Sequence, residues 1–173
     1  MSKIKWNPRT ITGCGLLIAI SVVLARLIAY APTQSTRYSL ETLPIFLSGL
    51  LYGPAAGALV GFASDAVGCF FSPYGYNPLF ALPPLLLGLY AGLWRSRVDA
   101  SPDWLRFTLA LLPPMALGYV ALQSASLAFV YHRESFLPFF YTNLAARGVQ
   151  YSLIFAADLL LSKLLYPVIR RRP

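Results

Sequence analysis

The sequence predicts an all-α integral membrane protein with six transmembrane helices and both termini in the cytoplasm. The chain of 173 residues is 57% hydrophobic and only 12% charged, whereas soluble proteins carry about 25% charged residues. Apolar runs recur along its whole length, as membrane helices require. Basic residues cluster before the first helix, after the fourth helix and at the end of the chain. The positive-inside rule predicts that these clusters lie on the cytoplasmic side of the membrane. No part reads as a soluble unit, so we expect one membrane domain over residues 1–173.

The first helix is predicted at about residues 10–30. It exceeds the roughly 20 residues that one crossing needs. It is preceded by the basic residues Lys3, Lys5 and Arg9, as the apolar region of a signal peptide is. It lacks a small-x-small cleavage site followed by a polar region, and we therefore interpret it as a retained helix.

Residues 40–51 form a second predicted helix that is too short to cross alone. We expect it to start in the outer interface and to run inward. A Tyr-Gly-Pro turn at residues 52–54 then reverses the chain, with proline at the first helical position where its missing N–H costs nothing. The third helix, residues 54–71, is rich in glycine, alanine and serine, which allows close approach between membrane helices.

Three further helices are predicted at residues 78–94, 107–130 and 138–166. The first contains the pair Pro83-Pro84 and the second the pair Pro113-Pro114. A proline pair removes backbone donors and kinks a helix. In a membrane this is tolerated where neighbouring groups or a cavity satisfy the freed carbonyls.

The formal net charge of +8 reflects membrane topology rather than nucleic-acid binding. The basic residues gather on one side if there are six helices, which is the positive-inside pattern. They precede the first helix, flank the connection after the fourth and close the chain: Lys3, Lys5, Arg9, Arg95, Arg97, Arg106, Arg170, Arg171 and Arg172.

Catalytic, redox and metal chemistry find little support. Cys14 and Cys69 are predicted at opposite membrane faces, too far apart for a disulfide, and no zinc or haem spacing occurs. The single histidine, His132, lies in a predicted loop, while Asp65 and Asp158 fall at different depths. An intramembrane protease would need a buried Ser–His pair or two paired aspartates.

The main functional signal is a group of polar side chains on four helices. Counting about 1.5 Å per residue places them all between the membrane centre and the outer face. An isolated acid in an apolar run is costly and marks a functional site by default, and arginine binds carboxylates bidentately. The matching ligand has an amide-bearing aromatic ring at one end and carboxylates at the other. The six residues are Arg26, Asp65, Gln123, Asn143, Arg147 and Gln150.

Five of these six residues also have a purely structural interpretation. Arg26 can extend to the outer headgroups, and Asp65 with Arg147 can form an ion pair between two helices. Gln123 and Gln150 can form ordinary interhelical hydrogen bonds.

Further out, the tyrosines near the outer loops, Tyr74, Tyr76 and Tyr131, can belong to the interfacial aromatic belt. Asp158 is expected on the inner side, as a partner of Lys163 or as a cap.

The chain resembles the substrate-binding S components of energy-coupling factor (ECF) vitamin transporters, specifically the folate-specific members. The resemblance covers nearly the whole chain and is strongest between residues 26 and 92. The residues that carry it are Arg26, Arg37-Tyr38-Ser39-Leu40, Leu43-Pro44, Gly49, Tyr52-Gly53-Pro54, Gly57, Gly61, Asp65, Gly68 and Tyr76-Asn77-Pro78.

This resemblance implies a multi-pass subunit of the bacterial cytoplasmic membrane that captures folate in an outward-facing pocket and delivers it inward. It implies no enzymatic activity and no cofactor, because a transmembrane coupling subunit and two cytoplasmic ATPases would supply ATP hydrolysis. The family docks to its partner through an Ala-x-x-x-Ala pattern on the first helix. Gly15-x-x-x-Ala19 is the nearest match at the right depth, and Ala25-x-x-x-Ala29 lies too near the outer end.

For folate, the resemblance suggests roles for three groups of residues, with Gln123 as a further pocket residue. Arginines would bind the glutamate carboxylates or the pterin carbonyl, polar residues the pterin amide edge, and aromatic residues would stack on the rings. These groups are Arg26, Arg37 and Arg147; Asp65, Asn77, Asn143 and Gln150; and Tyr38, Phe46, Tyr74, Tyr76 and Phe80. Another vitamin, such as riboflavin or thiamine, and a non-transport membrane protein stay open as alternatives, although three arginines disfavour the thiamine cation.

Overall fold

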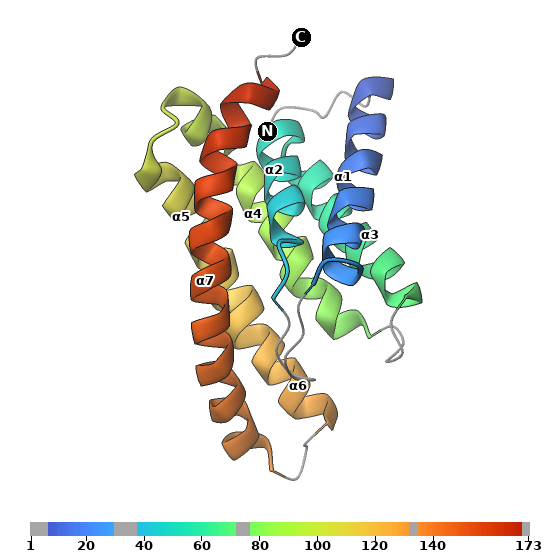
Figure 1. Ribbon diagram of the computed structural model, residues 1–173, viewed down its shortest axis with the longest axis vertical. Coiled ribbons are helices and arrows are strands. Elements are labelled where there is room, and N and C mark those ends of the chain that lie inside the picture. Colours follow the sequence, from blue (N-terminus) through green and yellow to red (C-terminus); the bar gives the residue numbers. More distant parts are fainter. Residues whose placement is uncertain (1–6, 30–37, 72–76, 132–134, 171–173) are drawn as a thin grey trace.

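The computed structural model describes residues 7–29, 38–71, 77–131 and 135–170, and it confirms the all-helical class. Because α5, η1 and α6 follow one another without a break, the chain forms six helical rods (Figure 1). The elements are α1 (Pro8–Arg26), α2 (Thr42–Tyr52), α3 (Pro54–Phe70), α4 (Pro78–Ala100), α5 (Trp104–Pro114), the π-helix η1 (Met115–Leu122), α6 (Gln123–Tyr131) and α7 (Phe136–Arg170).

The rods run up and down along the long axis of the molecule. Figure 1 shows the start of α1, the end of α4 and the end of α7 at one end of the bundle, while α6 meets α7 at the other. Three helical stretches of the described chain are long and apolar enough to cross a membrane: Pro8–Arg26, Trp104–Tyr131 and Phe136–Arg170. The α2–α3 pair consists of shorter apolar helices.

Several predicted helix boundaries were wrong. The first helix ends at Arg26 rather than at residue 30. The fourth helix continues past residue 94 to Ala100, because Val98 in its final turns is completely buried. The last helix extends from Phe136 to Arg170, beyond both predicted ends.

The start of α2 also differs from the prediction. The helix begins at Thr42 rather than at residue 40, and Thr42, Leu43 and Pro44 are all buried. The Thr42 hydroxyl donates a hydrogen bond to the Asp158 carboxylate on α7. This hydrogen bond joins the start of the short helix to α7.

Glycine residues let α2, α3 and α4 pack backbone against backbone. A Cβ atom on Gly57 of α3 would lie within 3 Å of the Gly88 carbonyl oxygen on α4, and one on Gly88 would meet the Gly57 carbonyl oxygen. Gly49 of α2 is blocked by Gly88 in the same way, and Gly61 by Pro84. The small-residue face predicted for the third helix is therefore the contact surface with α4.

A charged and aromatic network joins the ends of α4 and α7. Asp99 forms an ion pair with Arg170 and accepts a hydrogen bond from the Tyr166 hydroxyl, and Arg95 Nε lies 3.8 Å from its second carboxylate oxygen. The Phe107 ring of α5 packs edge-on against Tyr166 at 5.7 Å between centroids. These contacts hold the three helix ends together.

The two proline pairs have different consequences. Pro83 and Pro84 lie inside α4, which continues through them. Pro113 and Pro114 end α5, and the π-helix η1 starts at the next residue. Loss of backbone donors at the second pair favours the wider helical turn that follows.

We predict that Gly88→Ala lowers the thermal unfolding temperature of the detergent-purified protein, by a destabilisation of about 1–3 kcal/mol or more. The added methyl group would collide with the backbone of Gly57, which cannot move without separating α3 from α4. Gly148→Ala is the matched control, because a Cβ there meets nothing within 4 Å. Equal unfolding temperatures for the two variants would contradict the close packing of α3 and α4.

Candidate functional site

A cavity of about 60 Å³ lies where the end of α1, the end of α3 and the starts of α2, α4 and α6 converge. Four residues predicted to bind a ligand, Arg26, Asp65, Phe80 and Gln123, line it together. Ligand pockets for vitamin-sized molecules have volumes of about 300–1,000 Å³, so a bound ligand requires the lining groups to move apart. The complete lining is Ser21, Ala25, Arg26, Glu41, Ile45, Ser64, Asp65, Gly68, Phe80, Pro84, Tyr119 and Gln123.

Arg26 extends from the last turn of α1 across the surface of α3. Its Nη2 atom lies 3.2 Å from the position that a Cβ atom on Gly68 would occupy. Gly68 therefore makes the space that the guanidinium fills, and Arg26 turns to the cavity rather than to the outer headgroups. Its Nε atom is buried and has no hydrogen-bond partner in the described part of the chain.

Two carboxylate residues face the same cavity as this guanidinium. Asp65 comes from the middle of α3, and its Oδ2 atom lies 3.9 Å from the Cys69 thiol one turn later. Glu41 precedes α2, and its backbone oxygen accepts a 3.0 Å hydrogen bond from the Ser21 hydroxyl of α1. Sequence reasoning missed Glu41, although an acid directly after the segment 37–40 was a usable signal.

Three more lining residues carry buried polar atoms without a hydrogen-bond partner among the described residues. These atoms are Ser64 Oγ of α3, the Tyr119 hydroxyl of η1 and Gln123 Oε1 of α6. Buried polar groups in native structures are nearly always satisfied by protein or by bound molecules. Together with Arg26 Nε, they form a cluster of polar atoms that a ligand or ordered water can satisfy.

Three predicted polar residues lie on α7. Asn143, Arg147 and Gln150 are all buried on α7, as is Tyr151, whose ring lies 5.1 Å from the Tyr119 ring. The Asn143 side chain donates a 2.9 Å hydrogen bond to the Phe139 carbonyl within its own helix. The three predicted residues are not among those that line the cavity, and α7 approaches the lining through the contact between Tyr151 and Tyr119.

The remaining predicted ligand contacts have other surroundings. Phe46 is completely buried in the apolar core and does not line the cavity. The Asn77 side chain caps α4 by accepting a 3.1 Å hydrogen bond from the Leu79 amide, and Tyr38 is partly exposed. Arg37, Tyr74 and Tyr76 lie outside the described residues.

The expected pairing of Asp158 with Lys163 at the inner face was wrong. Asp158 is completely buried and accepts a hydrogen bond from Thr42, whereas the Lys163 ammonium lies 3.9 Å from the Trp104 ring centroid. Depth counted along one straight helix did not show that Thr42, at the start of α2, lies beside Asp158. The second oxygen, Asp158 Oδ1, has no hydrogen-bond partner in the described chain.

Metal ligation is not indicated by the described residues, which contain no cluster of three or more histidine, cysteine, aspartate or glutamate side chains. Neither Cys14 nor Cys69, both among the described residues, forms a disulfide. The cavity therefore offers a ligand hydrogen bonds and charged groups, because the Arg26 guanidinium and the carboxylates of Glu41 and Asp65 line it together.

Comparison with known proteins gives a consistent picture. A sequence model of the family "ECF-type riboflavin transporter, S component" matches residues 5–166. Among solved structures, FolT bound with folic acid has a TM-score of 0.79 and 26% identity, covering 93% of this chain and 94% of that one. The S component for biotin from an ECF-type ABC transporter has a TM-score of 0.65 and 16% identity, covering 100% and 96%. No curated protein sequence matches.

We predict that Thr42→Val lowers thermal stability by about 1–3 kcal/mol, because it leaves a completely buried carboxylate without its hydroxyl donor. Thr42→Ser keeps the donor and is the matched control. Thermal unfolding in detergent measures both variants. A valine variant as stable as the serine variant would show that the hydrogen bond to Asp158 does not hold α2 to α7.

Proposed function

The chain belongs to the S-component family described by the model for the ECF-type riboflavin transporter, and we propose that its own ligand is a folate. S components are the substrate-binding subunits of vitamin transporters and are not enzymes. On this proposal the protein captures folate at the outer side of the membrane, and partner subunits hydrolyse ATP.

The observation that carries the folate proposal is the pairing of charges around the cavity. Folate has a pterin ring whose amide and amino N–H groups suit a carboxylate, and a glutamate tail whose carboxylates suit a guanidinium. Asp65 and Glu41 offer the first partner and Arg26 the second. The likeness to FolT bound with folic acid over nearly the whole chain supports the same ligand class.

Further predicted residues extend this assignment. Arg147 supplies a second buried guanidinium on α7, and Gln150 an amide one turn further on. Phe80 at the start of α4 provides a flat apolar surface on which a ring can stack. An opening of the cavity towards α7 would bring these groups into reach of one elongated ligand.

Riboflavin is the second candidate, because the matching family model carries its name. Its isoalloxazine ring and uncharged ribityl chain have no carboxylate for Arg26 to bind. A riboflavin site would leave the Arg26 charge to be compensated by the protein's own acids, whereas folate uses it directly.

The orientation of the chain follows from its charges. Arg9, Arg95, Arg97, Arg106 and Arg170 all lie at the end of the bundle where α1 starts and α7 ends. By the positive-inside rule, these charges support an orientation with this end in the cytoplasm. The cavity then lies on the outer side of the basic end, where a vitamin arrives.

We predict that the purified protein, stripped of ligand, binds folic acid with a nanomolar Kd, as followed by quenching of tryptophan and tyrosine fluorescence. Arg26→Gln should weaken binding about 10–100-fold, since hydrogen bonds to charged groups contribute about 1.5–3 kcal/mol. Asp65→Asn should weaken it as well, by removing the acceptor for the pterin edge. Arg9→Gln, an exposed position at the far end of α1, is the matched control and should bind like the parent.

The same titration with riboflavin and biotin separates the candidates. Nanomolar binding of riboflavin with no response to folates would keep the family and overturn the folate proposal. An Arg26→Gln variant with parental folate affinity would remove that residue from the site.

We further predict that Gly15→Leu on α1 abolishes co-purification with the coupling subunit and its ATPases while leaving folate affinity unchanged. Gly15 and Ala19 lie on an exposed face of α1, and a Cβ at residue 15 meets nothing within 4 Å, so the change leaves the fold intact. Gly148→Leu places the same side chain in similarly open space on α7 and should retain the partners. Retention of the partners by Gly15→Leu would place the docking surface elsewhere.

A further inference from the structure

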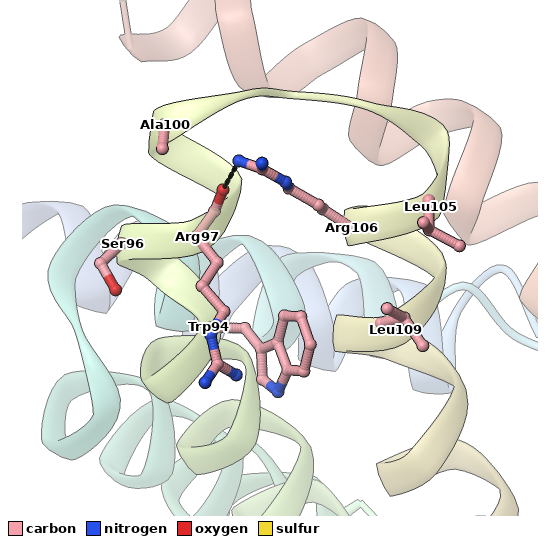
Figure 2. Close-up of a pocket in the computed structure, with 7 residues that line it drawn as sticks. All are labelled: Trp94, Ser96, Arg97, Ala100, Leu105, Arg106 and Leu109. Atoms are coloured by element: carbon pink, nitrogen blue, oxygen red, sulfur yellow. Dashed lines mark hydrogen bonds between the residues drawn. The ribbon is translucent and has the colours of Figure 1, made fainter.

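A second hollow lies at the opposite end of the molecule from the α6–α7 junction. It has a volume of about 410 Å³ and opens between the last turns of α4 and the first turns of α5. Figure 2 shows Arg106 reaching back from α5 toward α4, and Arg97 folded alongside the Trp94 ring. The lining residues are Trp94, Ser96, Arg97, Ala100, Leu105, Arg106 and Leu109.

The two arginines of the hollow are held in place by contacts other than ion pairs. Arg106 Nη1 donates a 2.6 Å hydrogen bond to the Arg97 backbone oxygen, which joins the two helix ends (Figure 2). The Arg97 guanidinium carbon lies 4.5 Å from the Trp94 ring centroid. Both contacts leave guanidinium N–H groups available, and they position the two cations before any ligand binds.

No carboxylate of the described chain neutralises these two cations. Asp99, on the same stretch of α4, is already bound by Arg95 and Arg170. Asp103, at the start of α5, is exposed and forms no ion pair with either arginine within the described residues. The hollow is therefore a site of uncompensated positive charge.

The surface next to the hollow is apolar. Leu105, Leu109 and Leu112 follow one face of α5 and are 67%, 39% and 47% exposed. Leu93 of α4 is also exposed. A hydrocarbon chain can lie along this face, in continuity with the membrane core, while its polar group remains at the arginines.

We propose that this hollow binds the headgroup of an anionic phospholipid, with the phosphate at Arg97 and Arg106 and an acyl chain along Leu105, Leu109 and Leu112. Basic pockets between membrane helices bind such headgroups, and the cytoplasmic leaflet is the anionic one. Tryptophan favours the depth at which headgroups meet hydrocarbon. The position at the basic end of the bundle puts the hollow at that leaflet.

Native mass spectrometry of the detergent-purified chain tests this, with phosphatidylglycerol and zwitterionic phosphatidylcholine as the two lipids. The parent and Arg9→Gln should bind phosphatidylglycerol at least about ten-fold more tightly than phosphatidylcholine, and the double variant Arg97→Gln/Arg106→Gln should lose this preference. Helix content by circular dichroism and elution volume on size exclusion establish that each variant is folded. Glycerol 1-phosphate, the headgroup without acyl chains, should compete weakly.

Three results would overturn the lipid site. One is an undiminished phosphatidylglycerol preference in the double variant. If that variant also loses its partner subunits, the hollow is a contact surface for another protein. Another is an equal loss in Arg9→Gln, which would indicate unspecific charge. The third is that glycerol 1-phosphate displaces bound phosphatidylglycerol as effectively as added phosphatidylglycerol does. The hollow would then bind the phosphate group alone.

Discussion

The backbone contact between α3 and α4 at Gly57 and Gly88 is the constraint on which the rest of the structure depends. Lipid tails are as apolar as leucine, so membrane helices associate through close packing rather than through the hydrophobic effect. With Gly49 of α2 packed at the same place, three helices form one tight unit. This unit holds α3 and α4 side by side, and Asp65 of α3 and Phe80 of α4 line the same cavity.

The same face of α3 has a different neighbour at each end. At Gly61 the space that a side chain would occupy is filled by the backbone of Pro84. Two turns later, at Gly68, the corresponding space is filled by the guanidinium of Arg26. The small residues of α3 therefore serve two purposes. At Gly61 they allow close packing against the α4 backbone, and at Gly68 they leave room for the Arg26 guanidinium at the cavity.

Much of this arrangement could be predicted from the sequence, because single polar residues stand out in apolar runs. Arg26, Asp65 and Gln123 were expected between the membrane centre and the outer face, and they line one cavity. Tyr119 could not be recognised, since a tyrosine in an apolar helix is ordinary and the Pro113-Pro114 pair predicted a kink rather than the π-helix that carries this tyrosine. The partner of Asp158 was missed because counting along one helix does not show which side chain of another helix lies beside it, here Thr42 at the start of α2.

The two arginine sites of the molecule differ in what compensates their charge. Arg26 shares its cavity with Glu41 and Asp65, so protein carboxylates lie close to it and a ligand anion must compete with them. Such competition favours a ligand that also supplies N–H donors for the acids, because it then replaces the internal partners on both sides. A ligand with only carboxylates, or only N–H groups, would leave one sign of charge buried and unmatched. At the basic end Asp99 belongs to the α4–α7 network, and on our proposal an anionic lipid supplies the counter-charge for Arg97 and Arg106.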